Sequence, residues 1–174
     1  MVQTEFTTPR LRIAHWRTAR AIQTERKALE NALLDLLTPP VLAHLPPSLQ
    51  LLNRKDSLTD WITARDAESD VLTVSQQQDG MLIGLMILAP SPAATQPPVL
   101  HLGYLLRETA WGQGYATEIV GGFISAQSRD TALTLRGGVD TANPASARVL
   151  KKCGFTRRDD LSDMETALYE RTLP

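Results

Sequence analysis

The stretch from Val99 to Glu118 constrains the fold more than any other part of the chain. It reads VLHLGYLLRETAWGQGYATE, an apolar run followed by a polar turn with two glycines and then a helix-like pattern. The run Val99–Leu106 is largely apolar on both faces, which predicts a strand buried on both sides. A strand, glycine turn and helix can hold a phosphate group, because glycines let backbone N–H groups approach an anion and the helix dipole favours negative charge. A G-x-G turn alone is a weak signal for this function.

Seven strands and four helices are indicated along the chain by the spacing of its apolar residues. Strands are predicted over residues 10–15, 71–76, 81–88, 99–106, 131–137, 155–158 and 166–172. Helices are predicted over residues 18–37, 57–67, 114–127 and 144–153. Asp79-Gly80 is a strong hairpin signal between two of the strands. This order predicts an α/β (α+β) fold with a mixed, mostly antiparallel sheet of six to seven strands flanked by helices.

Several local signals refine these boundaries. Pro39-Pro40 is expected to end the first helix, and the proline-rich segment 38–50 is expected to be largely non-helical. Ser57 begins a weak capping box with Asp60 for the second helix. The pair Gly121-Gly122 weakens the third helix, so close packing on the sheet is the expected reason for its presence.

Composition limits the class of protein. The chain has 174 residues of which 43% are hydrophobic, which predicts one globular domain over residues 1–174. The net charge is −1 without blocks of like charge, so no nucleic acid or membrane partner is expected. The single cysteine, Cys153, excludes an internal disulfide, and the three histidines lack metal-ligand spacing, so no metal is expected. No signal peptide or membrane helix is recognisable, which predicts a cytoplasmic protein.

A second stretch, residues 143–155, reads NPASARVLKKCGF and predicts a short helix. Asn143 is a good N-cap, Pro144 suits the first helical position, and Gly154 suits a left-handed stop. Together, the two stretches resemble the GNAT superfamily of acetyl-CoA-dependent N-acyltransferases. The resemblance is closest to the branch with the ribosomal-protein alanine N-acetyltransferases, where W-G-x-G-Y/I-A-T/S-E and N-x-x-S-x-x-x-x-x-x-x-G-F recur. Residues 8–13, TPRLRI, resemble the opening strand of that branch, whereas residues 15–70 match no motif.

The resemblance implies a GNAT-like fold whose sheet splays between Val99–Leu106 and the next strand, with Gly103 expected to carry a bulge or a close backbone approach. It implies acetyl-CoA as co-substrate, with its pyrophosphate at the glycine turn and its pantetheine arm along the strand end and at Asn143. An N–H of Leu105 or Leu106 is expected to polarise the thioester carbonyl. The residues expected at the pyrophosphate are Gly112, Gln113, Gly114, Tyr115, Ala116 and Thr117, and those expected at the arm are Tyr104, Leu105, Leu106 and Arg107.

Two residues are candidates for proton transfer. The resemblance implies that Ser146 protonates the leaving thiolate; the alternative is a first-turn serine that satisfies a backbone donor. His101 stands where the branch commonly has Glu, and imidazole suits a base near neutral pH. The alternative for His101 is a packed strand histidine, in which case a water chain would serve as base. Glu108 is a poorer candidate because it lies in the phosphate turn.

The acceptor is expected to be a primary amine that attacks acetyl-CoA directly in a ternary complex. Both a protein N-terminus and a small amine, such as a polyamine, amino acid or aminoglycoside, stay open, as do a monomer and a homodimer. Trp61 and the segment 38–50 are expected to wall the acceptor pocket, because two N-terminal helices usually cover it in the family. Trp16, Trp61 and Trp111 are interpreted as packing residues, so Trp61 has two interpretations, and Cys153 is interpreted as a buried structural thiol.

Two other functions stay open from the sequence. A non-catalytic acyl-CoA sensor on the same fold would bind CoA without turnover. A nucleotide-binding module would need parallel β-α-β units and an acidic residue about 20 positions after the glycines. That region holds Thr131-Ala132-Leu133, with Asp130 as the only nearby acid, and the chain has no Walker lysine.

Overall fold

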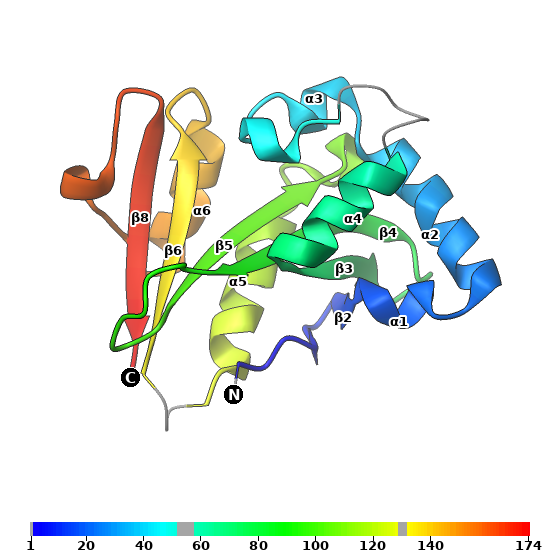
Figure 1. Ribbon diagram of the computed structural model, residues 1–174, viewed down its shortest axis with the longest axis horizontal. Coiled ribbons are helices and arrows are strands. Elements are labelled where there is room, and N and C mark those ends of the chain that lie inside the picture. Colours follow the sequence, from blue (N-terminus) through cyan, green and yellow to red (C-terminus); the bar gives the residue numbers. More distant parts are fainter. Residues whose placement is uncertain (1, 52–57, 129–131) are drawn as a thin grey trace.

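The structure is a computed structural model that describes residues 2–51, 58–128 and 132–174. Within these residues eight strands form one sheet in the order β1-β2-β3-β4-β5-β6-β8-β7 (Figure 1). The strands are β1 (Phe6–Thr7), β2 (Leu11–His15), β3 (Asp70–Gln76), β4 (Leu82–Pro90), β5 (Val99–Leu106), β6 (Leu133–Asp140), β7 (Thr156–Arg157) and β8 (Thr166–Leu173). The α-helices are α1 (Trp16–Arg20), α2 (Gln23–Leu36), α3 (Pro39–Leu42), α4 (Leu58–Glu68), α5 (Tyr115–Ala126) and α6 (Pro144–Lys152). Short 3-10 turns are η1 (Pro47–Leu49), η2 (Glu108–Ala110) and η3 (Asp159–Leu161).

The sheet is mixed and mostly antiparallel, as the sequence predicted. Every neighbouring pair is antiparallel except β5 and β6, which run parallel because α5 crosses over between them. The described residues form one strand more than the six to seven that were predicted. The additional strand is β1, which is only two residues long and therefore too short to show an alternating pattern in the sequence.

The sheet splays between β5 and β6. These strands pair over only three residues, from Val99 opposite Thr134 to His101 opposite Arg136, and then diverge toward the top of Figure 1. The predicted position of the splay is therefore confirmed. The predicted bulge at Gly103 is wrong, because the β4–β5 register runs through this residue without a shift and a Cβ added there would meet nothing within 4 Å.

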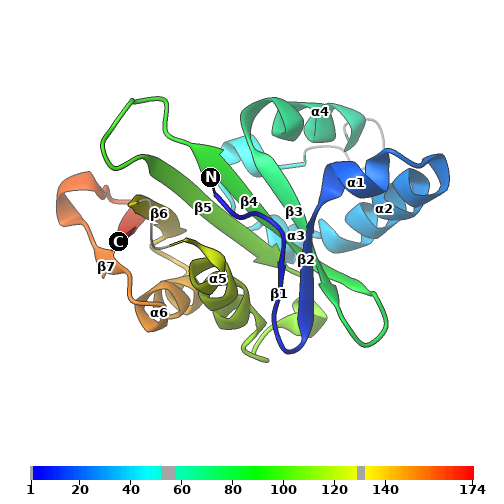
Figure 2. The ribbon, with the colours of Figure 1, turned by 90° about the horizontal axis from the view of Figure 1, so that it is seen from below.

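Helices cover both faces of the sheet (Figure 2), with α5 and α6 on one face and α1 to α4 on the other. Leu102 and Leu106 of β5 belong to the hydrophobic cluster that includes Phe123 of α5. Leu105 of β5 belongs to a second cluster with Leu33 of α2. The two-sided burial predicted for β5 is thus confirmed, and alternate residues of this strand face different helical layers.

The N-terminal helices differ from the prediction in two ways. The helix expected over residues 18–37 is two helices, broken at Ala21 and Ile22. Trp16 and Arg17 donate hydrogen bonds to the Asp66 carboxylate of α4, and this long-range anchoring directs α1 independently of α2. The break turns Ile22 to solvent, where 52% of it is exposed.

The proline-rich segment is more helical than expected. Pro39 and Pro40 occupy the first positions of α3, where a missing N–H costs nothing, so they begin a helix rather than only ending one. Pro47 likewise opens η1. The capping box expected at Ser57 and the start of the strand expected at Thr131 lie outside the described residues.

Gly122 of α5 is the glycine of the central pair that close packing requires. A Cβ at this position would lie 2.6 Å from Thr8 and 2.9 Å from the Phe6 ring of β1. A Cβ at Gly121 would meet nothing within 4 Å, so packing explains only one of the two glycines. Among the described residues, none of the helices is both long and apolar enough to span a membrane.

Candidate active site

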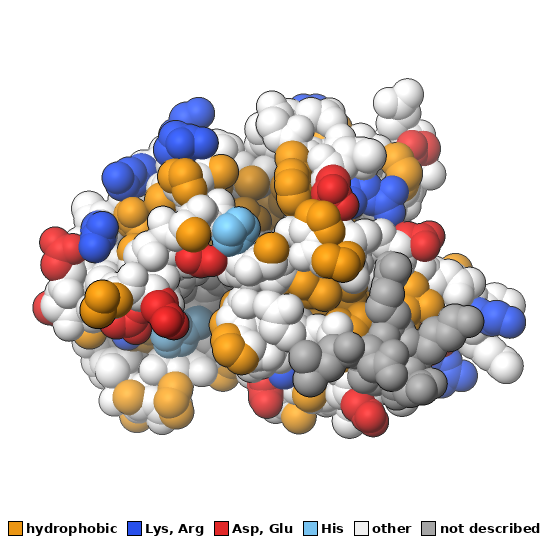
Figure 3. Space-filling model, turned by 90° about the horizontal axis from the view of Figure 1, so that it is seen from above, with side chains coloured by type: hydrophobic (Ala, Val, Ile, Leu, Met, Phe, Trp, Pro, Cys, Tyr) orange, Lys and Arg blue, Asp and Glu red, His pale blue; other side chains and the backbone are white. Residues whose placement is uncertain are grey.

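A cleft of about 1090 Å³ enters the sheet at the splay between β5 and β6. The splay divides the sheet into two lobes, one with β1 to β5 and the other with β6 to β8. Figure 3 views the molecule from above, the direction in which these lobes diverge in Figure 1. The cleft is lined by β5, β6, the glycine turn, α6 and the segment from Pro40 to Leu49. It reaches both faces of the sheet, so one ligand can meet another through the gap between the strands.

The backbone of β5 bonds to β4 at alternate residues. The N–H of Arg107 donates to the carbonyl of Ile83 at 2.8 Å, and the N–H of Ser91 donates to the carbonyl of Val99 at 3.0 Å. In an antiparallel ladder, residues that bond to one neighbour alternate with residues that face the opposite side. The odd-numbered residues of β5 therefore bond to β4.

The N–H groups of Tyr104 and Leu106 consequently face the splay, beyond His101, the last residue of β5 that pairs with β6. The N–H of Leu105 points at β4, as does that of Arg107. The structure therefore leaves two of the four expected strand residues with a backbone donor that a ligand can reach.

The glycine turn leads from β5 into α5. Gly112 and Gly114 have φ of +72° and +80°, a backbone region that L side chains rarely adopt. The first hydrogen bond of α5 runs from the N–H of Glu118 to the carbonyl of Gly114. The N–H groups of residues 115–117 precede this bond and point out of the helix end, where an anion can accept from them.

Side chains from outside the turn hold it in place. Arg10 donates to the Gln113 carbonyl at 3.1 Å, its guanidinium stacks 4.1 Å from the centroid of the Tyr115 ring, and it pairs with Glu118. Trp111 is half exposed rather than packed, and its Nε1 donates to the carbonyl of Leu106 at 2.8 Å. The sequence predicted the turn but not these supports, and the packing role predicted for Trp111 is wrong.

On α6, the predicted cap is present and the candidate acid gains a partner. The Asn143 side chain accepts from the N–H of Ser146 at 3.1 Å. The Ser146 hydroxyl lies 2.8 Å from the Tyr104 hydroxyl of β5. Burial raises the pKa of Tyr104 to about 12, although the hydrogen bond with Ser146 acts in the opposite direction. Tyr104 therefore stays a neutral phenol that can donate to Ser146.

His101 lies on the opposite face of β5 from the side chains of Tyr104 and Ser146. It lines the cleft and stands beside Arg136, its register partner on β6. Burial, followed by the positive charge of Arg136, lowers the pKa of His101 below its usual 6.5. The imidazole is therefore neutral at pH 7, as a base must be.

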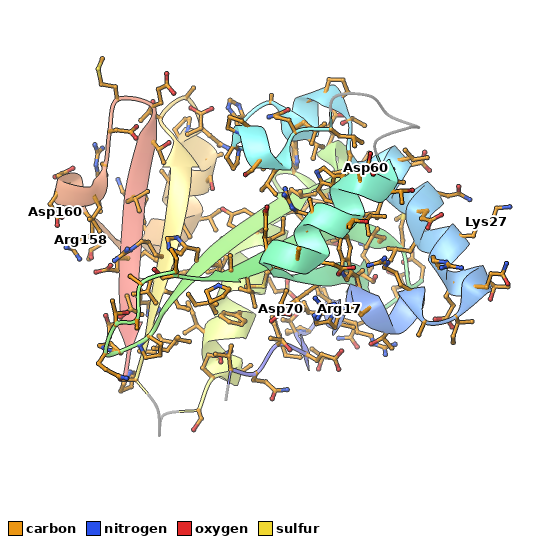
Figure 4. All side chains as sticks on the ribbon, viewed as in Figure 1. Arg17, Lys27, Asp60, Asp70, Arg158 and Asp160 are labelled. Carbon is orange, nitrogen blue, oxygen red and sulfur yellow. The ribbon has the colours of Figure 1, made fainter. Side chains whose placement is uncertain are left out.

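Arg136 is itself fixed by a chain of ion pairs. Its Nη2 lies 2.6 Å from a carboxylate oxygen of Glu170 on β8, which also pairs with Arg158. Arg158 pairs with Asp160 at 2.7 Å, and Figure 4 shows these two side chains at the outer side of β8. No sequence motif indicated these ion pairs, because their members come from β6, from β8 and from the segment between β7 and β8.

The segment 38–50, expected to wall the acceptor pocket, contributes to the lining of the cleft. Residues between Pro40 and Leu49 line the cleft opposite His101. Trp61 stands behind this wall rather than in it, and its Nε1 donates to the Leu49 carbonyl at 3.0 Å. His44 lies 2.8 Å from Asp140 at the end of β6, so the segment contacts both lobes of the molecule.

Other expected residues take structural roles. Glu108 accepts from the Thr38 hydroxyl at 3.0 Å, outside the cleft lining. Cys153 is buried beneath α6, and burial raises the pKa of its thiol, which suits the predicted structural role. The Gln113 side chain donates to the Thr109 carbonyl, so only the backbone of Gln113 is left to contact a ligand at the turn.

Comparison with known proteins places these features in context. The family model described as "Acetyltransferase (GNAT) domain" matches residues 16–156, and a search of curated proteins found no match. The fold is similar to RimL, a ribosomal L7/L12 alpha-N-protein acetyltransferase in complex with coenzyme A, at 16% identity and a TM-score of 0.68 over 99% of this chain and 97% of that chain. It is also similar to an acetyl transferase from Salmonella typhimurium that modifies the N-terminal serine of L7/L12, at 16% identity and a TM-score of 0.67 over 99% of both chains. A spermidine N-acetyltransferase from Vibrio cholerae in complex with CoA and spermine aligns at 14% identity and a TM-score of 0.67, over 94% of this chain and 95% of that chain.

Proposed function

Because the chain belongs to the GNAT acetyltransferase family, we propose that it transfers acetyl from acetyl-CoA to a primary amine by direct attack in a ternary complex. One observation carries this proposal. The backbone N–H groups of Tyr104 and Leu106 have no partner strand at the splay, and they lie at the end of β5 that continues into the glycine turn. A hydroxyl pair lies on one side of this strand and a neutral imidazole on the other.

The described residues fit the shape of acetyl-CoA. The pyrophosphate accepts from N–H groups between Gly112 and Thr117, where a Cβ on either glycine would hold the anion off. The pantetheine arm then pairs with the backbone of β5 as an additional strand would. Since the arm runs from the turn toward the splay, it passes Leu106 before Tyr104. The thioester therefore reaches the N–H of Tyr104, beside Ser146, rather than the inward-facing N–H of Leu105.

A backbone donor at this point stabilises the negative charge that develops on the carbonyl oxygen. Removal of one such donor typically costs about 3–4 kcal/mol of transition-state stabilisation. The donor is held by the β4–β5 ladder, so it needs no rearrangement when the charge forms.

Ser146 donates its hydroxyl proton to the departing thiolate and is reprotonated from solvent, while Tyr104 stays protonated and donates a hydrogen bond to Ser146. The observed distance of 2.8 Å between the two hydroxyls allows this hydrogen bond. Asn143 fixes the first turn of α6 through its bond to the Ser146 N–H, so the serine side chain keeps its position.

His101 accepts the proton that the attacking amine loses. Its location on the other face of β5 lets the amine approach through the splay from the side opposite the hydroxyl pair. A positioned base contributes roughly 10²–10⁴-fold to such a reaction. The lowered pKa of His101 keeps it in the accepting form at neutral pH.

Initial-rate kinetics with both substrates varied test this function. Direct attack requires both substrates to be bound together, so double-reciprocal plots should intersect. Parallel plots would indicate an acetylated enzyme and contradict the proposed mechanism. Binding of acetyl-CoA without transfer to any amine would instead favour the non-catalytic sensor.

A further inference from the structure

We call the part of the cleft on the His101 face of the sheet the acceptor chamber. Its floor is formed by Ile87 and Ala89 of β4, by Gly103 of β5 and by Gly138 of β6. Its roof is formed by residues from Pro40 to Leu49. Because a Cβ added at Gly103 would meet nothing within 4 Å, the missing side chain at this position leaves open space in the floor.

The lining of the chamber combines an apolar patch with polar and charged side chains. The polar and charged lining residues are His44, Ser48, Arg65, Glu68, Ser69, His101, Arg136 and Asp140. Ile87 on the floor and Val41 in the roof are each more than 90% buried, so they expose only small apolar surfaces to the space between them. The further apolar lining residues are Pro40, Ala43, Leu45, Pro46, Leu49 and Ala89. Binding of an apolar group here removes from water both the hydrocarbon surface of the ligand and that of these lining residues.

Each described carboxylate at the chamber already has a side-chain partner. Glu68 lies 2.9 Å from Arg65, which is itself only 4% exposed. Asp140 accepts from His44 at 2.8 Å, and this hydrogen bond lowers the pKa of Asp140. A ligand with a second ammonium group would therefore be desolvated in the chamber without a carboxylate left to pair with it.

The roof is fixed by side chains from several elements. The Gln50 side chain donates to the carbonyls of Leu42 and Leu45, both at 2.8 Å. Arg65 donates to the Ser48 carbonyl, and His44 joins the roof to β6. A roof held from both lobes suits a small ligand, because a protein N-terminus would bring backbone amides that the apolar residues of the roof leave without partners.

From this lining we infer that the acceptor is a small primary amine on an apolar body, of the alkylamine or arylalkylamine class, and neither a polyamine nor a protein N-terminus. The inference rests on the proposed function, since it names the substrate class of the same site. The amino group reaches His101 and the thioester through the splay, while the apolar body fills the space between Ile87, Leu45 and Leu49.

A homologous series of amines tests the inference with the full chain. Acetyl-CoA is supplied at saturation, and released thiol is measured with butylamine, pentylamine, hexylamine and 1,6-diaminohexane. We expect kcat/KM to rise about fourfold for each added methylene, because burial of one CH₂ is worth about 0.8 kcal/mol. Hexylamine and 1,6-diaminohexane have the same chain length, so their ratio isolates the second ammonium, and we expect hexylamine to be strongly preferred.

The outcomes separate the inference from the proposed function. Preference for 1,6-diaminohexane or spermidine, or acetylation of peptides with free N-terminal serine or alanine in place of the alkylamines, would overturn the apolar acceptor and leave the transferase intact. Bound acetyl-CoA with no transfer to any of these amines would overturn the apolar acceptor, and no transfer to amino acids or aminoglycosides either would overturn the proposed function as well. A flat response across the alkylamine series would also contradict the inference.

A single substitution gives an independent check. Leu49→Asp adds an unpaired carboxylate to the roof, so the ratio of kcat/KM for hexylamine over 1,6-diaminohexane should fall by at least an order of magnitude. Leu49→Asn, which is similar in size but uncharged, is the matched control and should retain most of the preference. Calorimetry with acetyl-CoA on both variants verifies that each is folded, and an unchanged ratio in the folded Asp variant would contradict the inference.

Discussion

The hydroxyl of Tyr104 on β5 lies 2.8 Å from the hydroxyl of Ser146 on α6. This contact joins the strand proposed to bind the pantetheine arm to the helix that carries the candidate acid. It assigns the Tyr104 side chain to the site, whereas the sequence indicated a role only for its backbone.

Ser146→Ala should lower kcat by about a hundredfold, since it removes the proposed proton donor to the thiolate. The affinity for acetyl-CoA should change little, because the Asn143 cap accepts from the backbone N–H of residue 146 and survives the substitution. Thiol-release kinetics and calorimetry measure the two effects separately.

Tyr104→Phe keeps the ring and removes only the hydroxyl, so it should lower kcat by about tenfold, as loss of one hydrogen bond predicts. If the two hydroxyls act as one pair, the double variant should be no slower than Ser146→Ala. Additive losses would show that Tyr104 and Ser146 act independently.

The pH dependence of kcat/KM should report His101. Since burial and Arg136 lower its pKa, the imidazole is neutral above pH 6.5, and activity should be lost only as the pH falls through the lowered pKa. Arg136→Gln removes the nearby charge, so the acidic limb should move to higher pH. Arg158→Gln is the matched control, because Arg158 also pairs with Glu170 but is not among the groups that shift the pKa of His101. An acidic limb that persists unchanged in His101→Ala would remove this residue as the base.

Gly103→Val should reduce kcat/KM for the acceptor by at least roughly tenfold, the discrimination expected when added methyl groups enter an apolar pocket. The substitution should be tolerated by the fold, because a Cβ at Gly103 meets nothing within 4 Å. Gly121→Ala is the control, since its Cβ also enters open space but on α5, outside the cleft lining. Equal acceptor kinetics in both variants would show that the floor of the chamber does not contact the acceptor.

Elements with strong local signals were predictable from the sequence. The bounds of β5 were predicted correctly, and the Asp79-Gly80 turn and the Asn143 cap form as expected. In each case the determining residues lie within a few positions of one another. The break between α1 and α2 was not predictable, because it depends on contacts of α1 with Asp66 on α4.

The candidate site divides in the same way. The glycine turn and the first turn of α6 are local motifs and were found. Arg10 supports the turn from 103 residues away, His44 meets Asp140 across 96 residues, and Tyr104 meets Ser146 across 42 residues. A single sequence contains no local pattern that indicates contacts between residues so far apart. These contacts become visible only in the folded structure, where the sheet brings the residues together.

The glycine turn is the proposed binding site for the pyrophosphate of acetyl-CoA, so its disruption is the central test. Gly114→Glu places a side chain and a negative charge where the pyrophosphate accepts from the helix end. Gly80→Glu is a closely matched control, because Gly80 has a φ of +74° against +80° for Gly114 but lies in the hairpin between β3 and β4. Both variants carry a similar backbone strain of about 1–2 kcal/mol.

The most direct measurement is a calorimetric titration of the wild-type chain and these two variants with acetyl-CoA, with NAD and ATP as control ligands. We expect the wild type and Gly80→Glu to bind acetyl-CoA selectively and Gly114→Glu to lose binding. Equal affinity of Gly114→Glu and wild type for acetyl-CoA, or no binding by the wild type, would contradict the assignment of this turn and the proposed function with it.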